Sequence, residues 1–311
     1  MTARALARNP TDVRERGGAW TRGQARKNDA ILVAVRVALG ASRLVPAAAL
    51  RVVGRAIGRA AHLLFGGARR TALANVAVAM PTLDGPARRA LVRRVFVHLG
   101  EHLGDAVALL SDRATLRPLV LAREDRAVLA DAIAEGRGVV FASAHLGAWE
   151  RLGATLVAEG VPLTTVAREA YDPRLDAIYD RLRGGRGVRA IYRGRPGAGT
   201  RMVKVLRSGG VLGVLMDLRS RVPSIDVAFL GRPAPTAVGP ARLALRTGAA
   251  VVVGACAPGG RARILRIATS DLAAEPDRER LLTARINEAL SGFILAMPEA
   301  WVWMHERYVH R

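Results

Sequence analysis

The feature that most constrains the fold is an alternation of strand-like and helix-like segments from residue 124 onward. Short apolar runs bounded by glycine or proline predict strands, and the periodic segments between them predict helices. We expect strands at 139–144, 162–167, 188–192, 211–216, 225–229, 249–257 and 261–268, and helices at 124–135, 146–158, 173–186, 200–208, 239–247 and 278–296. The last two strands read as a hairpin. This alternation predicts an α/β fold with a largely parallel central sheet flanked by helices.

The segment before residue 124 lacks this alternation and reads as helical. Basic and apolar residues alternate with helical spacing over 28–44 and 47–65, and a third helix is expected over 86–110. We therefore divide the chain into a basic tail, 1–27, a helical portion for the membrane interface, 28–120, and an α/β domain, 121–311. The last two form one continuous domain.

Positive charge is in excess and unevenly distributed. The 311 residues carry 48 Lys+Arg against 26 Asp+Glu, a net charge of +22, and residues 1–70 alone hold 14 basic and 3 acidic side chains. Such an excess predicts an anionic partner: nucleic acid, an anionic membrane, or an acidic carrier or substrate. No zinc-finger spacing or aromatic RNA-binding strand is present, so we expect no nucleic acid. Lys27 and Lys204 are the only lysines, and GC-rich codon bias accounts for part of the arginine content.

The N-terminal helices have the pattern of helices that lie on a membrane. A spanning helix needs about 18 apolar residues in a row, whereas the longest uncharged run, Thr247–Gly260, has 14. Arg51, Arg55 and Arg59 follow at four-residue steps along one helix face, opposite Ala, Val, Leu and Ile. This arrangement favours an interfacial helix whose guanidinium groups reach toward lipid phosphates. An ordinary surface helix packed on its own domain is the alternative.

Cysteine and histidine usage argues against a metal centre. Cys256 is the only cysteine, which excludes an intramolecular disulfide framework and a cysteine zinc site and suits a reducing compartment. His98, Glu101 and His102 match the H-x-x-E-H pattern of some zinc proteases. The leucines beside these histidines belong to the apolar stripe of the predicted helix, however, so we interpret the pattern as part of a packed helix and expect no metal.

Polar side chains follow three of the predicted strands where each strand ends. His145, Arg168 and Asp217 come after 139–144, 162–167 and 211–216. Since parallel strands end at the same edge of a sheet, all three are expected at one crevice. Glu150 follows His145 by five residues, at the start of the next helix, from where its carboxylate can reach one imidazole nitrogen. The other nitrogen is then free to accept a proton.

Several common catalytic motifs are missing from the chain. There is no G-x-S-x-G elbow, no Walker loop and no G-x-G-x-x-G after a strand. A histidine–carboxylate pair without a protein nucleophile is typical of sites in which a substrate hydroxyl is the nucleophile. The sequence thus predicts direct acyl transfer, with a histidine that is merely hydrogen-bonded in a loop as the alternative.

His145-Leu-Gly-Ala-Trp-Glu150 resembles the H-x4-E block of the late acyltransferases of lipid A biosynthesis, within the lysophospholipid acyltransferase-like superfamily. The resemblance covers about residues 30–310. Further blocks follow in the family's order at 75–81, 166–168, 172–175, 213–217, 229–236, 239–244 and 298–308.

The resemblance implies a glycerol-phosphate-acyltransferase-like fold and an enzyme at the cytoplasmic face of the bacterial inner membrane. Such an enzyme moves a fatty acyl chain from a thioester, on acyl carrier protein or CoA, to a hydroxyl of a phosphorylated glycolipid, and no cofactor is expected. Carried over to this sequence, His145 is the general base and Glu150 its orienting partner. The acceptor-binding residues would be Leu146, Gly147, Ala148, Arg168, Asp217 and Arg307.

Departures from the family pattern leave the acceptor open. Leu146 and Ala148 stand where the family more often has Phe and Asn. A related branch, which acylates phosphatidylinositol mannosides, typically carries H-x4-D and a different C-terminal segment, so Glu150 and the Trp-rich end favour the lipid A branch. A lysophospholipid, a phosphatidylinositol mannoside or an ornithine lipid is the alternative acceptor. A membrane-binding module without catalysis is disfavoured because both His145 and Glu150 are retained.

Overall fold

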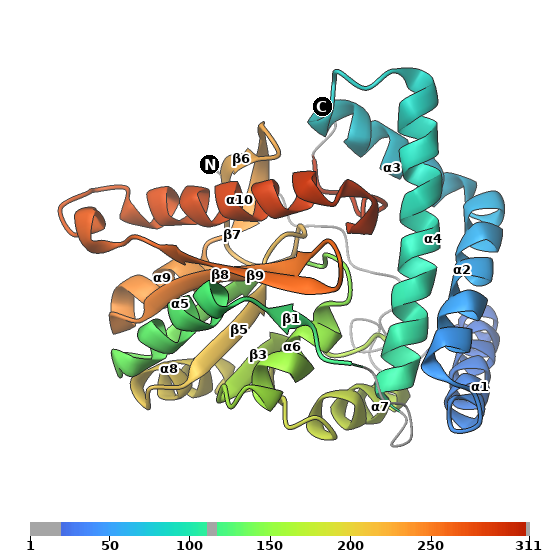
Figure 1. Ribbon diagram of the computed structural model, residues 1–311, viewed down its shortest axis with the longest axis horizontal. Coiled ribbons are helices and arrows are strands. Elements are labelled where there is room, and N and C mark those ends of the chain that lie inside the picture. Colours follow the sequence, from blue (N-terminus) through green and yellow to red (C-terminus); the bar gives the residue numbers. More distant parts are fainter. Residues whose placement is uncertain (1–19, 111–116, 309–311) are drawn as a thin grey trace.

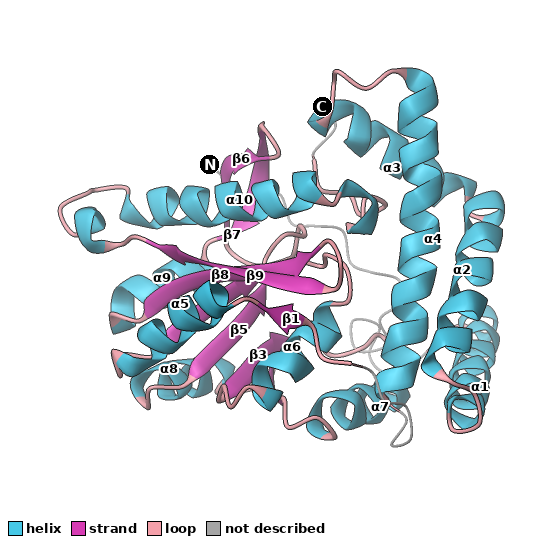
Figure 2. Ribbon diagram, in the orientation of Figure 1, coloured by secondary structure: helices cyan, strands magenta, loops and turns pink. Residues whose placement is uncertain are grey.

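The computed structural model describes residues 20–110 and 117–308, in which helices surround a seven-stranded sheet (Figure 1, Figure 2). The helices are α1 (Arg22–Ser42), α2 (Ala47–Leu64), α3 (Gly66–Ala79), α4 (Gly85–Leu109), α5 (Arg123–Ala134), α6 (Trp149–Ala158), α7 (Pro173–Gly184), α8 (Ala198–Arg207), α9 (Gly239–Thr247) and α10 (Arg278–Ala296). The strands are β1 (Val120–Leu121), β2 (Val139–Ser143), β3 (Leu163–Ala167), β4 (Arg189–Tyr192), β5 (Val211–Leu215), β6 (Ser224–Phe229), β7 (Arg232–Ala237), β8 (Ala250–Ala257) and β9 (Arg261–Ile267).

The main sheet is mostly parallel, which confirms the predicted α/β class. Its strand order is β1-β9-β8-β2-β5-β3-β4. The strands from β8 to β4 run parallel to one another, and β9 turns back against β8 as the expected hairpin. Strand β2 therefore lies near the middle of the sheet, between β8 and β5. Its carboxyl end is flanked by the carboxyl ends of parallel neighbours.

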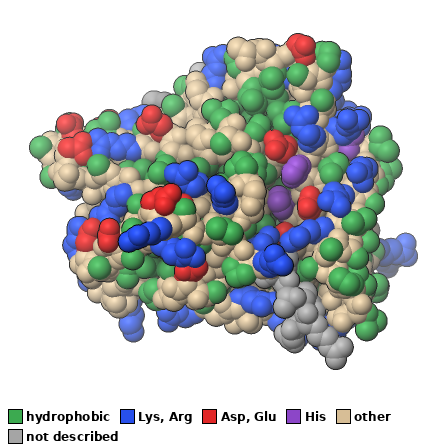
Figure 3. All heavy atoms as spheres, viewed as in Figure 1, with side chains coloured by type: hydrophobic (Ala, Val, Ile, Leu, Met, Phe, Trp, Pro, Cys, Tyr) green, Lys and Arg blue, Asp and Glu red, His purple; other side chains and the backbone are tan. Residues whose placement is uncertain are grey.

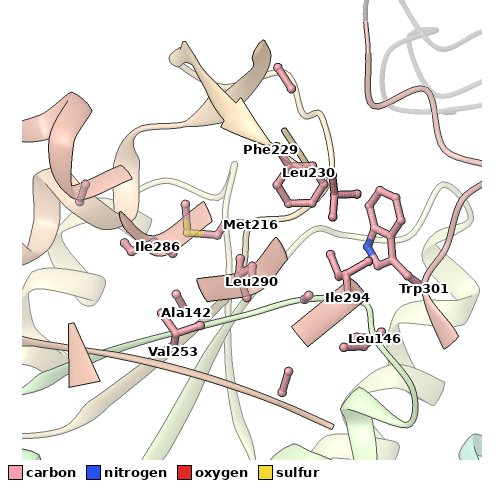
Figure 4. Close-up of a cluster of buried hydrophobic side chains, with 14 of the residues drawn as sticks. Ala142, Leu146, Met216, Phe229, Leu230, Val253, Ile286, Leu290, Ile294 and Trp301 are labelled. Atoms are coloured by element: carbon pink, nitrogen blue, oxygen red, sulfur yellow. The ribbon is translucent and has the colours of Figure 1, made fainter. Parts of the chain in front are cut away.

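Alternating side chains of the strands build two cores, one on each face of the sheet. In β2, Val140 and Ala142 belong to the first core, and Val139 and Phe141 to the second. Helices α8, α9 and α10 pack on the first face, and α5 and α6 on the second. Figure 4 shows part of the first core, where Trp301 lies among aliphatic side chains of the sheet and α10. Buried on both faces, these strands read as nearly continuous apolar runs.

Strand 225–229 was predicted for the main sheet, and this was wrong. As β6 it pairs only with β7, in a separate antiparallel hairpin against which α10 packs. Strand β7 was missed because Pro233 and Pro235 lack the N–H of a central strand. In a two-stranded ribbon each strand has a free edge, so both prolines are accommodated.

The helix after β2 begins at Trp149, three residues later than predicted. Gly147 adopts a φ of +60°, a left-handed conformation that glycine reaches at little cost, and its N–H donates to the carbonyl oxygen of Ala300 at 3.0 Å. Leu146 forms a β-bridge with Trp301. The residues after His145 thus bond to the C-terminal segment instead of starting a helix.

The N-terminal helices differ from the expectation in their boundaries. Helix α1 begins at Arg22 behind a capping box of Thr21 and Gln24, so the end of the predicted tail is helical. The remainder of that tail, 1–19, lies outside the described residues. Helix α3 follows α2 directly and was not predicted. None of the helices in the described ranges combines the length and apolarity needed to cross a bilayer.

Glycines bring α2 and α4 into backbone contact. A Cβ on Gly54 would lie 2.1 Å from the carbonyl oxygen of Gly100, and one on Gly58 would lie 2.2 Å from that of Phe96. The two helices lie side by side beyond the edge of the sheet (Figure 1). This spacing leaves no room for a side chain at either glycine.

Two of the arginines predicted to face lipid bind α4 instead. Arg51 Nε lies 2.5 Å from a carboxylate oxygen of Asp105, and Arg55 lies 3.7 Å from Glu101. The two arginines are four residues apart on α2, and their carboxylate partners are four residues apart on α4, which runs antiparallel to α2. One face of α2 therefore pairs its positive charges with the negative charges on one face of α4. The prediction that these two side chains reach toward lipid phosphates is therefore wrong.

We predict that Gly54→Ala lowers the free energy of unfolding by about 2 kcal/mol, because the added methyl overpacks a contact between two backbones. Gly40→Ala is the matched control, since nothing lies within 4 Å of a Cβ at that helical position. It should be neutral or slightly stabilising. Chemical denaturation of both variants tests this, and equal stabilities would contradict the tight α2–α4 contact.

Candidate active site

Strand register brings His145 and Asp217 together. Ser143 of β2 is in register with Leu215 of β5, so the residues two positions further along both strands face each other. The Nδ1 atom of His145 lies 2.9 Å from Oδ1 of Asp217, and the backbone N–H of His145 donates to Oδ2 at 2.9 Å. Asp217 is completely buried. One carboxylate therefore holds both the ring and the backbone of the histidine.

Trp301 supplies a further donor to the same carboxylate. Its Nε1–H donates to Oδ2 of Asp217 at 2.7 Å, and the indole is fully buried with its ring edge-on to that of Trp303. Burial acts to raise the pKa of Asp217, but the His145 charge and the hydrogen bonds from His145 and Trp301 outweigh it and hold the pKa below its usual value. Asp217 is thus a buried carboxylate that stays ionised at neutral pH.

The carboxylate prepares His145 to act as a base. Because Nδ1 donates to Asp217, the neutral ring has Nε2 as its acceptor, and no hydrogen bond occupies Nε2 within the described ranges. Burial alone would lower the pKa of His145, but the charge of Asp217 and the bond to it raise the pKa above its ordinary value of 6.5. The side chain remains 27% exposed. A substrate hydroxyl can therefore reach the proton-accepting nitrogen.

Glu150 was predicted to orient the imidazole, and the structure gives it another partner. Its Oε1 accepts from Nη2 of Arg183 in α7 at 2.8 Å, and Arg183 Nε lies 3.4 Å from Oε2. The prediction was wrong because β5, whose position the sequence does not reveal, places Asp217 closer to the ring. Glu150 still acts on His145 through its charge, which raises the pKa of the histidine.

An apolar cavity adjoins this site, between the sheet and helices α6 and α7. The space in it that water-sized molecules can enter measures about 70 Å³. Its apolar lining includes Leu152, Leu156, Leu163, Leu182 and Val188. Glu150 and Arg183 are the ion pair in the lining, and Trp149, whose ring is edge-on to that of His145, also borders the cavity.

Two residues predicted to bind an acceptor are enclosed in the core. Leu146 is fully buried and points into the first core (Figure 4). Arg307 is also fully buried: it donates to the carbonyl oxygen of Pro235 and to Oγ1 of Thr236, and it stacks 4.3 Å from the ring of Phe229. Burial lowers the pKa of Arg307 to about 10. Neither side chain offers surface to a substrate, so both predictions are wrong for this structure.

The remaining predicted residues lie around the histidine. Gly147 is buried with its N–H bonded to Ala300, and Ala148 caps α6 beside the site. Arg168 follows β3 and is exposed; its Nη1 lies 3.0 Å from the Tyr171 hydroxyl and its guanidinium 4.5 Å from that ring. Arg168 thus stays at the same sheet edge as His145, two strands away.

The H-x-x-E-H segment lies in α4, where its side chains have other partners. The rings of His98 and His102 are 6.1 Å apart, and Glu101 faces Arg55. Burial lowers the pKa of His102 to about 4. In the part of the chain that the structure describes, no three His, Cys, Asp or Glu side chains form a group that could hold a metal ion.

A model of the family described as bacterial lipid A biosynthesis acyltransferase matches residues 26–310. The chain belongs to this family. Two curated phosphatidylinositol mannoside acyltransferases, from Mycobacterium tuberculosis strains CDC 1551 / Oshkosh and ATCC 25618 / H37Rv, are each 31% identical to it over 127 residues. That match covers 40% of this chain and 40% of each relative.

Membership confirms the family that the sequence blocks predicted and places the chain among acyltransferases. The sequence had favoured the lipid A branch, whereas both curated relatives carry the name of the phosphatidylinositol mannoside branch.

The sequence did not predict that Asp217 is the partner of His145. It also did not predict that Trp301 donates a hydrogen bond to Asp217 or that Arg183 pairs with Glu150. One signal in the sequence could have indicated this pairing: His145 and Asp217 lie the same number of residues beyond the ends of two apolar strands.

We predict that Asp217→Asn lowers acyl transfer by ~10³- to 10⁴-fold, because an amide cannot accept all three hydrogen bonds. With its NH2 toward Nδ1, the amide makes that nitrogen an acceptor and moves the ring proton to Nε2; with its NH2 toward the other two donors, it sets a donor against donors. In the wild type, activity should rise with pH through an inflection above 6.5, since the raised pKa of His145 must be passed before the base is free. In Asp217→Asn the inflection should move to lower pH. Initial rates measured across pH test both effects.

Glu150→Gln is the matched comparison for this experiment. It removes one negative charge near His145 without removing a hydrogen bond to the ring. We expect the inflection to move in the same direction, but by less than in Asp217→Asn. A larger displacement in Glu150→Gln would show that Glu150, and not Asp217, governs the histidine.

Proposed function

We propose that this protein is an O-acyltransferase that moves a fatty acyl chain from a thioester to a hydroxyl of a lipid A-type glycolipid. The donor is acyl carrier protein or CoA. The observation that carries the proposal is the hydrogen bond from partly exposed His145 to buried Asp217, beside an apolar cavity, in a chain of this family. The aspartate orients the histidine, and the histidine acts as general base.

The reaction follows from the protonation state of the pair. Nε2 of His145 accepts the proton of the acceptor hydroxyl as its oxygen attacks the thioester carbonyl carbon. The buried charge of Asp217 stabilises the imidazolium that forms. When the tetrahedral intermediate collapses, the carbon–sulfur bond breaks, and the imidazolium returns its proton to the departing thiolate. The ester is formed, the thiol is released, and the histidine is neutral again.

The cavity is suited to the hydrocarbon part of the donor. Each methylene taken out of water contributes about 0.8 kcal/mol, and the leucines of the lining offer no competing hydrogen bonds. Trp149 lines the cavity and its ring lies edge-on to that of His145, so an acyl chain bound in the cavity would lie near the proposed base. The Glu150–Arg183 pair keeps two charges in this lining mutually neutralised.

The proposed acceptor is held in a membrane, and the N-terminal helices offer a surface for it. Val53, Ile57 and Leu64 form a stripe on α2 and are 50% or more exposed, and Val33 and Val37 do the same on α1. Figure 3 shows apolar side chains gathered along the side of the molecule where these helices lie. We propose that this stripe lies in the surface of an anionic membrane, at the cytoplasmic face of the inner membrane, with nearby arginines such as Arg59 facing lipid phosphates.

A phosphatidylinositol mannoside is the second candidate acceptor. It is favoured by the names of the curated M. tuberculosis relatives, which share 31% identity with part of this chain. Both acceptors present a sugar hydroxyl on an anionic lipid, so the same pair of residues would serve either reaction.

We predict that purified protein transfers a radiolabelled acyl chain from a thioester to lipid, and that His145→Ala lowers the rate by at least ~10³-fold, because the base is lost. His98→Ala is the matched control, since that ring lies in α4 and has no contact with Asp217. Transfer by His145→Ala at the wild-type rate would refute the mechanism.

The acceptor is decided by supplying underacylated lipid A and phosphatidylinositol mannoside in parallel and identifying the product by mass spectrometry. Acylated lipid A supports the proposed reaction. Acylation of the mannoside alone would replace lipid A with the second candidate.

We predict that Ile57→Asp weakens binding to phosphatidylglycerol–phosphatidylcholine vesicles by about tenfold or more, because a charge replaces an apolar contact with lipid. Leu281→Asp is the control: Leu281 is 37% exposed and belongs to the first turn of α10. The start of α10 lies on the opposite side of the molecule from α2 (Figure 1). Cosedimentation measures both, and equal weakening would contradict the α1–α2 surface.

A further inference from the structure

Arg168 and Arg193 start next to each other at the edge of the sheet. Ala167 of β3 is in register with Tyr192 of β4, and each arginine is the next residue of its strand. The backbone N–H of Arg193 donates to the carbonyl oxygen of Ala167 at 2.8 Å, which continues the ladder to this point. Neighbouring strands lie about 4.8 Å apart. Equivalent positions in register point to the same face, so the two guanidinium groups share one region.

Arg193 has no carboxylate partner among the described residues. Arg193 is half-buried, and within the described ranges its side chain forms no hydrogen bond or ion pair. Glu169, the acid beside Arg168 in the sequence, binds Arg195 at 2.9 Å. Burial, together with the charge of Arg168, lowers the pKa of Arg193. The fold therefore places two like charges together and partly desolvates one of them.

A structural role does not account for this arrangement. A partly buried cation without a partner is unfavourable, and a second cation beside it adds repulsion. Both costs are offset when an anion binds between the two groups. Guanidinium forks match the oxygens of a phosphate in geometry and charge, and two of them can share one phosphate group.

We propose that Arg168 and Arg193 together bind a phosphate group of a substrate. This inference rests on the proposed acyl transfer and adds Arg193 to its binding residues. From the strand order β2-β5-β3-β4, the two arginines lie two and three strands from His145, or roughly 10 and 14 Å along the edge. The phosphate belongs either to the acceptor headgroup or to the phosphopantetheine arm of the donor.

The first measurement tests binding itself, with inorganic phosphate as the probe. Calorimetric titration of the full chain should show affinity about tenfold lower in Arg193→Gln, because a charged hydrogen-bond donor is removed. Arg193→Lys, which keeps the charge but not the fork, should lie in between. Arg189→Gln is the matched control: Arg189 is exposed at the other end of β4, and its loss should leave affinity unchanged. Thermal melting verifies that each variant is folded.

The second measurement identifies the source of the phosphate. If the acceptor carries it, Arg193→Gln raises KM for a phosphorylated glycolipid by about tenfold, and the difference disappears with the dephosphorylated lipid. If the donor carries it, KM for acyl-CoA rises instead, and the difference disappears with an acyl N-acetylcysteamine thioester, which has no phosphate. Either result supports the pair as a phosphate site.

The proposal is overturned if wild-type protein binds no inorganic phosphate, or if Arg193→Gln binds it as tightly as the wild type. Failure of the proposed acyl transfer gives a different result. In that case phosphate binding still depends on Arg193, while no thioester donor supports transfer. A folded Arg193→Gln protein with unchanged KM values for all donors and acceptors would also overturn the assignment.

Discussion

The site depends on one buried carboxylate. Asp217 accepts hydrogen bonds from the ring and backbone of His145 and from the indole of Trp301, so three donor groups from two distant parts of the chain meet at its two oxygen atoms. A buried charge is stable only when it is fully hydrogen-bonded. Because Asp217 needs all of these donors, the position of His145 depends on β5, which precedes Asp217, and on the C-terminal segment, which supplies Trp301. Loss of any donor alters both the geometry and the proton affinity of the histidine.

The C-terminal segment links that carboxylate to the N-terminal helices. Asn75 of α3 donates to the carbonyl oxygens of Trp303 and His305, both at 2.7 Å. Further along, Arg307 binds the backbone of β7. Buried hydrogen bonds therefore join two sequence blocks that are far apart in the chain, 75–81 and 298–308. Their resemblance to the family is explained by packing around the site, because Arg307 lies wholly inside the core.

The arginines of this protein differ in whether a carboxylate neutralises their charge. Arg51 and Arg55 are neutralised by carboxylates of α4, and Arg183 by Glu150 in the cavity lining. Arg193 has no such partner in the described structure and stands beside Arg168. A high arginine content is thus partly structural. Arg193 suits an anionic ligand because it is half-buried and has no carboxylate partner among the described residues.

Local patterns in the amino-acid sequence were enough to predict the α/β class and the main strands. They also predicted that His145, Arg168 and Asp217 lie at one edge of the sheet. Both predictions depend only on periodicity and strand ends, which are properties of contiguous residues. The partner of His145 was not predictable in this way. Glu150 is near in the chain, but Asp217 becomes the neighbour only when β5 inserts between β2 and β3 with Ser143 opposite Leu215. Strand order and register arise from long-range packing of both sheet faces. Tertiary contacts therefore assigned the carboxylate to the base, turned Arg307 inward and placed Arg193 beside Arg168.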